Sequence, residues 1–199
     1  MEALGFERFA VVGHDRGGRV GHRMALGHPD RVPKLAVLDI IPTCEVFETV
    51  DKDLAIAYYH WFFLAQPYDL PEKLIGSDPG YYLRKKLGGW GTHLKVFAAE
   101  TLAEYERCFR DPATIHASCE DYRAAATIDL PHDKADFGHK VGCPLLALWG
   151  SNGAMEKLYD VLEVWRGYAL DVGGRPLDAG HFPVEESPEE TAEELVSFL

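Results

Sequence analysis

The stretch FAVVGHDRGGRV, residues 9–20, runs from an apolar segment straight into a charged pair flanked by glycines. The run FAVV is typical of a strand buried on both faces of a parallel sheet. A glycine on each side of a polar residue, between a strand and a helix, is typical of a tight elbow that presents the middle side chain above the sheet. That side chain is Asp15. We expect it to act as a carboxylate nucleophile beside a helix N-terminus, and a helix-capping aspartate is the alternative.

Further runs along the chain predict an α/β fold. LAVLDI at 35–40 and CPLLALWG at 143–150 are short, apolar and bounded by turn residues, as the first run is. A helical pattern separates the first two runs, which predicts a strand-helix-strand unit. We expect another helix over AMEKLYDVLEVWRGYAL, 154–170. A last helix is expected after Ser187, with Ser187 and Glu190 forming a capping box.

Residues 42–140 break this rhythm with an aromatic-rich, mostly helical stretch that is too long for a connecting loop. We interpret it as an inserted helical cap, and refer to it as the cap. The remaining segments, 1–41 and 141–199, are then expected to form the core.

Composition limits the kinds of partner. A formal charge of −12 over 199 residues opposes general binding to nucleic acid or to anionic membranes. Neither a charged-then-apolar leader nor a run long enough to span a bilayer is present, and the four cysteines lack C-x-x-C spacing. We expect a cytoplasmic protein with reduced thiols, for which self-association into a homodimer is plausible.

A carboxylate nucleophile leaves an ester that water must hydrolyse, so a base is required. His181 in DAGHF is the candidate, because it follows the last short strand or turn region and comes late in the chain, as the base does in this elbow architecture. Asp39, at the carboxyl end of LAVLDI, is the expected acid partner, since the loop after LLALWG contains no aspartate. His14 is expected to shape the elbow. The other histidines, apart from His60, are expected at the surface or in the cap: His22, His28, His93, His116, His132 and His139.

Arg16 and Arg19 follow the elbow and suit an anionic substrate, whose carboxylate they could clamp. Solvent-facing arginines on an amphipathic helix are the alternative. The overall acidity of the chain makes such a local cationic pair necessary for any anionic ligand.

GHDRGGRV, LDIIPT, YHWFFLAQP, CFRDP, IHASCEDYRA, PLLALWG and GHF occur in this order over essentially the whole chain. The chain thereby resembles the fluoroacetate (haloacetate) dehalogenases of the α/β-hydrolase superfamily. The resemblance implies hydrolytic defluorination of fluoroacetate to glycolate, a small haloacid substrate, and no metal or organic cofactor. It implies three groups of site residues: Asp15, His181 and Asp39 as the catalytic set; Arg16 and Arg19 as the carboxylate clamp; His60, Trp61 and Tyr122 as the halide pocket.

Two other functions remain open at this point. An epoxide hydrolase uses the same Asp, His and acid with cap tyrosines, and Tyr58, Tyr59, Tyr81, Tyr82 and Tyr122 are available. The third reading is a non-enzymatic binding or interaction module. A serine esterase is disfavoured because aspartate occupies the elbow.

Family members begin well upstream of the equivalent of Met1. The resemblance therefore implies an α/β-hydrolase fold lacking its first strands, with an exposed sheet edge. We expect impaired activity unless an upstream segment or a partner completes the sheet.

Overall fold

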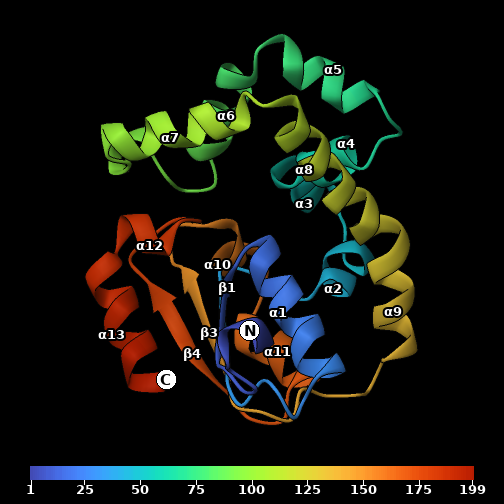
Figure 1. Cartoon of the computed structure of the whole chain (residues 1–199), viewed down its shortest axis with the longest axis vertical. Coiled ribbons are helices and arrows are strands. Elements are labelled where there is room, and N and C mark those ends of the chain that lie inside the picture. The colour runs from blue at the N-terminus through green and yellow to red at the C-terminus, as the bar shows by residue number, and fades with distance from the viewer.

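A four-stranded parallel sheet forms the centre of the computed structural model, which describes all residues 1–199 (Figure 1). Its strands are β1 (Val11–His14), β2 (Leu35–Leu38), β3 (Leu145–Gly150) and β4 (Val172–Leu177), in the order β1-β2-β3-β4. The predicted α/β class is therefore confirmed, and each of the three apolar runs contains or continues into a strand.

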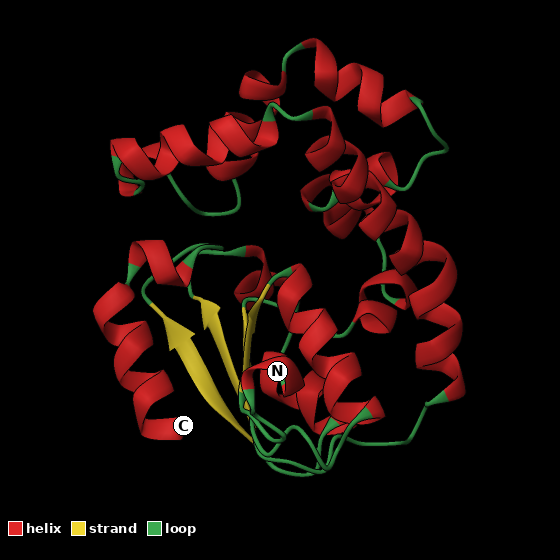
Figure 2. Ribbon diagram, in the orientation of Figure 1, coloured by secondary structure: helices red, strands yellow, loops and turns green.

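Both faces of the sheet are covered by helices (Figure 2). Leu35 and Val37 pack in one cluster with Trp165 of α11 (Val161–Tyr168) and Ala25 of α1 (Arg16–Gly27). The alternate residues of β2 face the other way, into a smaller cluster that is covered by α13 (Pro188–Phe198). Every residue of β2 and β3 is buried, which explains why these runs are uniformly apolar.

The cap consists of helices and connecting loops, and most of it lies over the carboxyl ends of the strands, while its first and last helices lie beside the helix that follows the elbow (Figure 1). Its segments follow one another through short connections, several of them started by a proline in the first turn. They are α2 (Thr43–Glu48), α3 (Lys52–Ala57), α4 (Tyr59–Leu64), α5 (Leu70–Ser77), α6 (Pro79–Leu87), the 3-10 helix η2 (Leu94–Val96), α7 (Ala99–Phe109), α8 (Pro112–Ala124), the π-helix η3 (Ala125–Asp129) and α9 (Leu130–Ala135).

The single helix predicted over 154–170 is wrong. The segment forms α10 (Ala154–Leu158) and α11, because the Asp160 carboxylate accepts a hydrogen bond from Glu163 N at 3.0 Å and starts a new helix. Two short helices complete the fold: the 3-10 helix η1 (Glu2–Leu4) and α12 (Pro183–Glu186).

The capping box predicted for α13 is also wrong. Ser187 Oγ donates a hydrogen bond to Asp178 O at 2.6 Å instead of accepting one from the helix. Glu190 pairs with Arg175 at 2.7 Å, so its carboxylate is directed to β4 and not back to the cap position.

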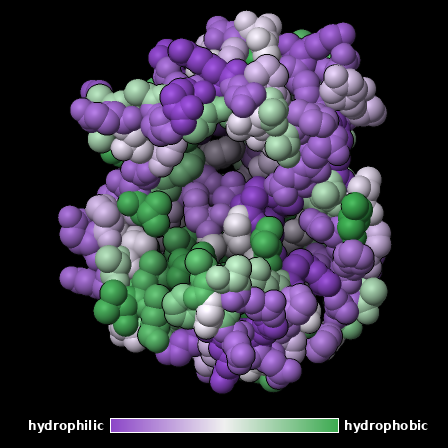
Figure 3. Space-filling view, viewed as in Figure 1, coloured by the Kyte–Doolittle hydropathy of each residue, from purple (hydrophilic) through white to green (hydrophobic).

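The surface differs between the cap and the sheet-containing part. The visible face of the cap is mainly hydrophilic, whereas hydrophobic residues gather over the lower part of the molecule (Figure 3). β1 has a neighbour on one side only, and Val12 on this strand is 42% exposed. No helix combines the length and apolar character required to cross a membrane.

Candidate active site

The elbow is built by close packing around Asp15, which directly follows β1. Its backbone adopts φ 47° and ψ −121°, and its N–H donates to Leu38 O at 3.3 Å. A Cβ on Gly13 would lie 2.4 Å from Gly17 O, and one on Gly18 would lie 2.8 Å from Gly13 O. Glycine is thus required at positions 13 and 18 so that α1 can begin immediately above the strand.

Asp15, Asp39 and His181 lie together although they come from three distant parts of the chain. His181 Nδ1 lies 2.6 Å from Asp39 Oδ2, and His181 Nε2 lies 3.5 Å from Asp15 Oδ2. Asp39 is 2% exposed, and its Oδ1 accepts a second hydrogen bond from Gly150 N at 2.9 Å. The imidazole is therefore held with one nitrogen on the buried acid and the other toward the elbow carboxylate.

Neighbouring charges shift the pKa values of this group strongly. Burial opposes protonation of His181, but its contacts with Asp15 and Asp39 and their negative charges outweigh burial and raise its pKa to about 10. Burial likewise opposes ionisation of Asp15, yet His181 and the Arg19 guanidinium hold the pKa of Asp15 well below its ordinary value. These shifts favour a protonated His181 beside an ionised Asp15.

A small cavity of about 10 Å³ lies above the elbow, which is room for about one water molecule. Nine residues line it: Asp15, Arg19, Asp39, Tyr58, His60, Trp61, Trp90, Ala154 and His181. The chain contains three non-glycine residues with positive φ, namely Asp15, Asp39 and Trp90, and all three line this cavity. Backbone strain concentrated in this way is typical of a functional site.

The three residues expected to hold a halide are close to one another in the cap. Tyr122 contacts both His60 and Trp61 edge-on, with ring centroids 5.6 and 5.7 Å apart. His60 Nδ1 is buried without a hydrogen-bond partner. Burial, followed by the charge of Lys86, lowers the pKa of His60 to about 3, so this ring is neutral at physiological pH. Tyr122 stands behind the other two and does not line the cavity.

The two arginines of the expected carboxylate clamp differ in position. Arg19 is 4% exposed, lies over the Trp61 ring at 4.4 Å, and lines the small cavity, where its Nε has no partner. Arg16 instead lines a neighbouring cavity of about 410 Å³ that Arg19 also borders. Its Nε and Nη2 bind Asp121, while its Nη1 is buried without a partner. Both guanidinium groups therefore retain an unused donor.

The structure adds residues that the sequence motifs did not indicate. Trp90 closes the cavity between His60 and His181, with both ring centroids 4.9 Å from its own. His14 contacts the backbone of the candidate base, since its Nε2 lies 2.6 Å from His181 O. The expectation that His22 lies at the surface is wrong: it is 3% exposed and packs edge-on against Trp165 in the core.

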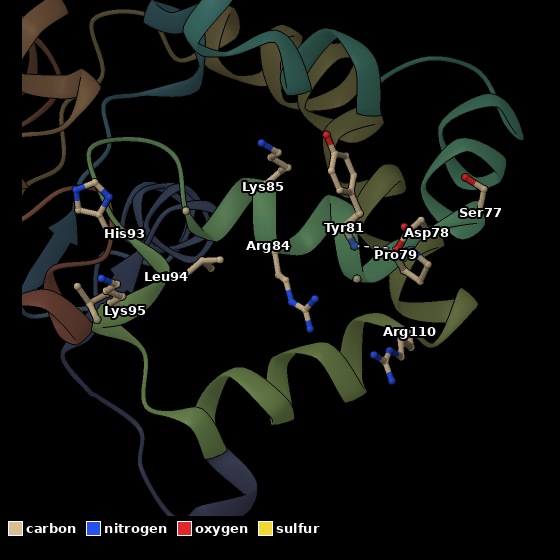
Figure 4. Close-up of a pocket in the computed structure, with 13 residues that line it drawn as sticks. Ser77, Asp78, Pro79, Tyr81, Arg84, Lys85, His93, Leu94, Lys95 and Arg110 are labelled. Carbon is tan, nitrogen blue, oxygen red and sulfur yellow. Dashed lines mark hydrogen bonds between the residues drawn. The ribbon is translucent and has the colours of Figure 1, made fainter.

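Two further groups of polar residues lie away from this cavity. Glu72, His116 and Glu120 could approach a metal ion together, but Arg123 Nη1 already binds both carboxylates at 2.7 and 2.6 Å. A cavity of about 1090 Å³ opens beside α6 and η2 (Figure 4). Arg84 and Arg110 on its wall are both paired with Glu106, whereas Lys85 and Lys95 on the same wall form no salt bridge.

An elbow aspartate, an Asp–His pair at the carboxyl ends of the strands and a helical cap define an α/β-hydrolase site. Residues 1–188 match the family model described as the alpha/beta hydrolase fold, and the chain belongs to this family.

Individual proteins of known sequence or structure are similar to this chain over essentially its whole length. The chain is 52% identical over 200 residues to a fluoroacetate dehalogenase from Burkholderia sp, with 100% of this chain and 66% of that protein covered. It is 31% identical to a soluble epoxide hydrolase from Corynebacterium sp. (strain C12), with coverage of 98% and 68%. A crystal structure from Nostoc sp PCC 7120, described only as an alpha/beta hydrolase, superimposes with a TM-score of 0.98 at 58% identity, covering 100% of this chain and 68% of that one. The chain thus spans about two thirds of the length of these relatives.

Proposed function

We propose that the protein hydrolyses the carbon–halogen bond of a small 2-haloacid, with fluoroacetate as the expected substrate and glycolate and halide as products. The observation that carries the proposal is the small cavity lined by Asp15, His181, Asp39 and Arg19 together. The identity of 52% to a fluoroacetate dehalogenase supports the choice of substrate.

The first step is displacement at the halogen-bearing carbon. An Asp15 carboxylate oxygen attacks that carbon, the carbon–halogen bond breaks, and the halide leaves with the electron pair, so an ester of Asp15 forms. The low pKa of Asp15 keeps this carboxylate ionised and ready to attack. The neutral His60 ring and the indole N–H of Trp61 can donate hydrogen bonds to the departing halide in place of water.

The second step is hydrolysis of the ester. His181 takes a proton from water, the resulting hydroxide adds to the ester carbonyl of Asp15, and collapse of the adduct expels glycolate, whose oxygen takes up a proton. His181 must be neutral to act as this base. Formation of the ester removes the negative charge of Asp15, which is one of the two carboxylates that raise the pKa of His181. The first step therefore prepares the base for the second.

The substrate carboxylate needs cations near the elbow in an acidic chain. Arg19 Nε and Arg16 Nη1 are buried donors without partners, and a carboxylate between them would satisfy both. A neutral epoxide has no carboxylate with which to satisfy these two donors.

An epoxide hydrolase is the second candidate because of the 31% identity to such an enzyme. That chemistry requires cap tyrosines to protonate the epoxide oxygen. Tyr59 and Tyr81 are 49% and 62% exposed, Tyr82 stacks on Phe109, and the Tyr58 hydroxyl is directed to Met155 Sδ at 3.8 Å. Tyr59 and Tyr122 contact the His60 ring but do not line the cavity. Of the five tyrosines only Tyr58 lines it, and its hydroxyl is directed to Met155, which disfavours the epoxide reaction.

The test is halide release from fluoroacetate and chloroacetate, followed with an ion-selective electrode, for the wild-type chain, Asp15→Asn and His181→Asn. We expect release by the wild type, none by Asp15→Asn, and in His181→Asn a single turnover that leaves added mass on the Asp15 peptide. Turnover of styrene oxide without halide release would instead establish the epoxide reaction. A folded wild-type chain that is inert toward both substrates would overturn the enzymatic proposal for this chain and favour a binding module.

A further inference from the structure

Lys86 on α6 is a cation that has aromatic partners and no acidic ones. Its Nζ lies 3.8 Å from the ring centroid of Tyr59, 4.9 Å from that of Trp90 and 5.9 Å from that of Tyr82. Burial alone lowers its pKa, to about 8, and no neighbouring carboxylate acts on it. A half-buried ammonium group stabilised only by aromatic faces is unusual, because surface lysines normally remain in water or pair with an acid.

Trp90 links this lysine to the candidate active site. One side of the indole contacts Lys86, while its ring lies 4.9 Å from both His60 and His181 and forms part of the cavity wall. The segment Gly88–Gly91 that carries Trp90 contains three glycines, and Trp90 itself has φ 55°. Such a backbone is a poor constraint on side-chain position, so the indole needs other contacts to hold it over the cavity.

The loop is fixed on its far side only by backbone packing. A Cβ on Gly91 would lie 2.4 Å from Asn152 O, and one on Gly180 would lie 2.6 Å from the carbonyl carbon of Gly91. These contacts dock the loop against the core next to His181 but do not orient the indole. The indole itself contacts the rings of His60, His181 and Phe182. Lys86 contacts it from α6 and links it to Tyr59.

We propose that Lys86 is a positioning residue that holds Trp90 over the cavity through the Tyr59–Lys86–Trp90 contacts, and that it thereby limits the size of the halogen the site accepts. This inference rests on the proposed haloacid chemistry for its effect on specificity, but the placement of Trp90 does not depend on it. Because Trp90 forms part of the wall of this small cavity, displacement of the indole would enlarge the space available to a larger halogen.

The test compares Lys86→Met, which keeps an unbranched side chain but removes the charge, with Lys86→Arg, which keeps the cation. Lys85→Met is the matched control, because Lys85 precedes Lys86 on α6 but lines the separate open cavity (Figure 4). Acrylamide quenching of tryptophan fluorescence reports the position of Trp90 without any turnover. The other three tryptophans, Trp61, Trp149 and Trp165, are only 2%, 7% and 0% exposed, and Trp90→Phe identifies the signal of Trp90.

In Lys86→Met we expect greater quenching of the Trp90 signal and an increase of about 2- to 30-fold in the ratio of kcat/KM for bromoacetate to that for fluoroacetate, from the usual strength of cation–π contacts. Lys86→Arg should resemble the wild type in both measurements. Equal quenching in Lys86→Met and the wild type, or the same change in Lys85→Met, would overturn the inference. If the wild type releases no halide, the proposed function fails, while the quenching comparison still decides whether Lys86 holds Trp90.

Discussion

His181 Nδ1 is hydrogen-bonded to Asp39 Oδ2 at 2.6 Å, across 142 residues of sequence. Asp39 is buried, and its contact with Nδ1 favours the ring orientation in which Nδ1 carries a proton and Nε2 is directed to Asp15. The same carboxylate accepts from Gly150 N, so its own orientation is set by the end of β3.

Asp39→Asn should reduce halide release by about 100-fold or more, since a positioned base contributes at least this much. An asparagine amide can donate to Nδ1, which would leave Nε2 protonated and unable to accept a proton from water. Ester should accumulate on Asp15, detectable by peptide mass. Asp160→Asn is the control, because Asp160 only caps α11, and it should leave turnover unchanged. Normal turnover in Asp39→Asn would show that Asp39 is not the acid partner of His181.

The raised pKa of His181 predicts a pH-dependent contribution to stability. His181 has an ordinary pKa near 6.5 and a folded-state pKa of about 10. Its contribution is therefore fully present below pH 6.5 and is lost as the pH rises through 10. Between about pH 7 and 9 this group should lower the free energy of unfolding by about 1.4 kcal/mol per pH unit.

The measurement is urea unfolding of the wild type and His181→Gln at several pH values. The wild type should lose stability with rising pH faster than the variant. Lys86, which titrates near pH 8, is present in both proteins and cancels from the difference. Parallel pH profiles would show that His181 is not held protonated between the two acids.

The sequence was informative where one short segment determines both structure and position. The β1 run followed by Gly13 and Asp15 contains the strand, the turn and the first residues of α1, so the elbow could be predicted locally. Asp39 could be predicted as well, because it follows a strand whose fully apolar character requires a central position in the sheet.

Features that depend on contacts between distant segments were missed. Trp90 reaches the site because its loop docks on Asn152 and Gly180, which no local pattern reveals. Arg16 is drawn to Asp121 on α8, so it does not line the cavity as Arg19 does. The prediction of a capping box was wrong for the same reason, since Ser187 Oγ donates to Asp178 O just after β4 and does not bind the backbone of its own helix.

Gly150→Ala should lower the free energy of unfolding by about 1–3 kcal/mol and should also reduce the rate of halide release. A Cβ at this position would lie 1.9 Å from Gly180 O, which is backbone and must move. That movement displaces the residue directly before His181. Gly173→Ala on the neighbouring strand is the control, because a Cβ there meets nothing within 4 Å. Thermal unfolding and halide release measure the two effects, and equal behaviour of the two variants would contradict the role of this close approach.

Replacement of Arg19 and of Arg16 by methionine should affect substrate binding to different extents, because the two side chains lie in different positions. Arg19→Met should raise the KM for fluoroacetate by about 10- to 100-fold, the range expected for a lost hydrogen bond to a charged group. Arg16→Met should raise it less, because Asp121 already occupies two of its donors.

Arg23→Met is the matched control for both arginines. Arg23 lies on the same face of α1 as the other two arginines, and it pairs with Asp133 and Asp136. It does not line the small cavity at the elbow. Initial rates over a range of fluoroacetate concentrations give KM, and inhibition by acetate gives an independent measure of carboxylate binding. If Arg19→Met lowered only the melting temperature and left both constants unchanged, Arg19 would be a structural residue and the carboxylate would have to bind elsewhere. If Arg16→Met had the larger effect, the substrate would displace Asp121 from Arg16 on binding, and the carboxylate would lie toward the neighbouring cavity.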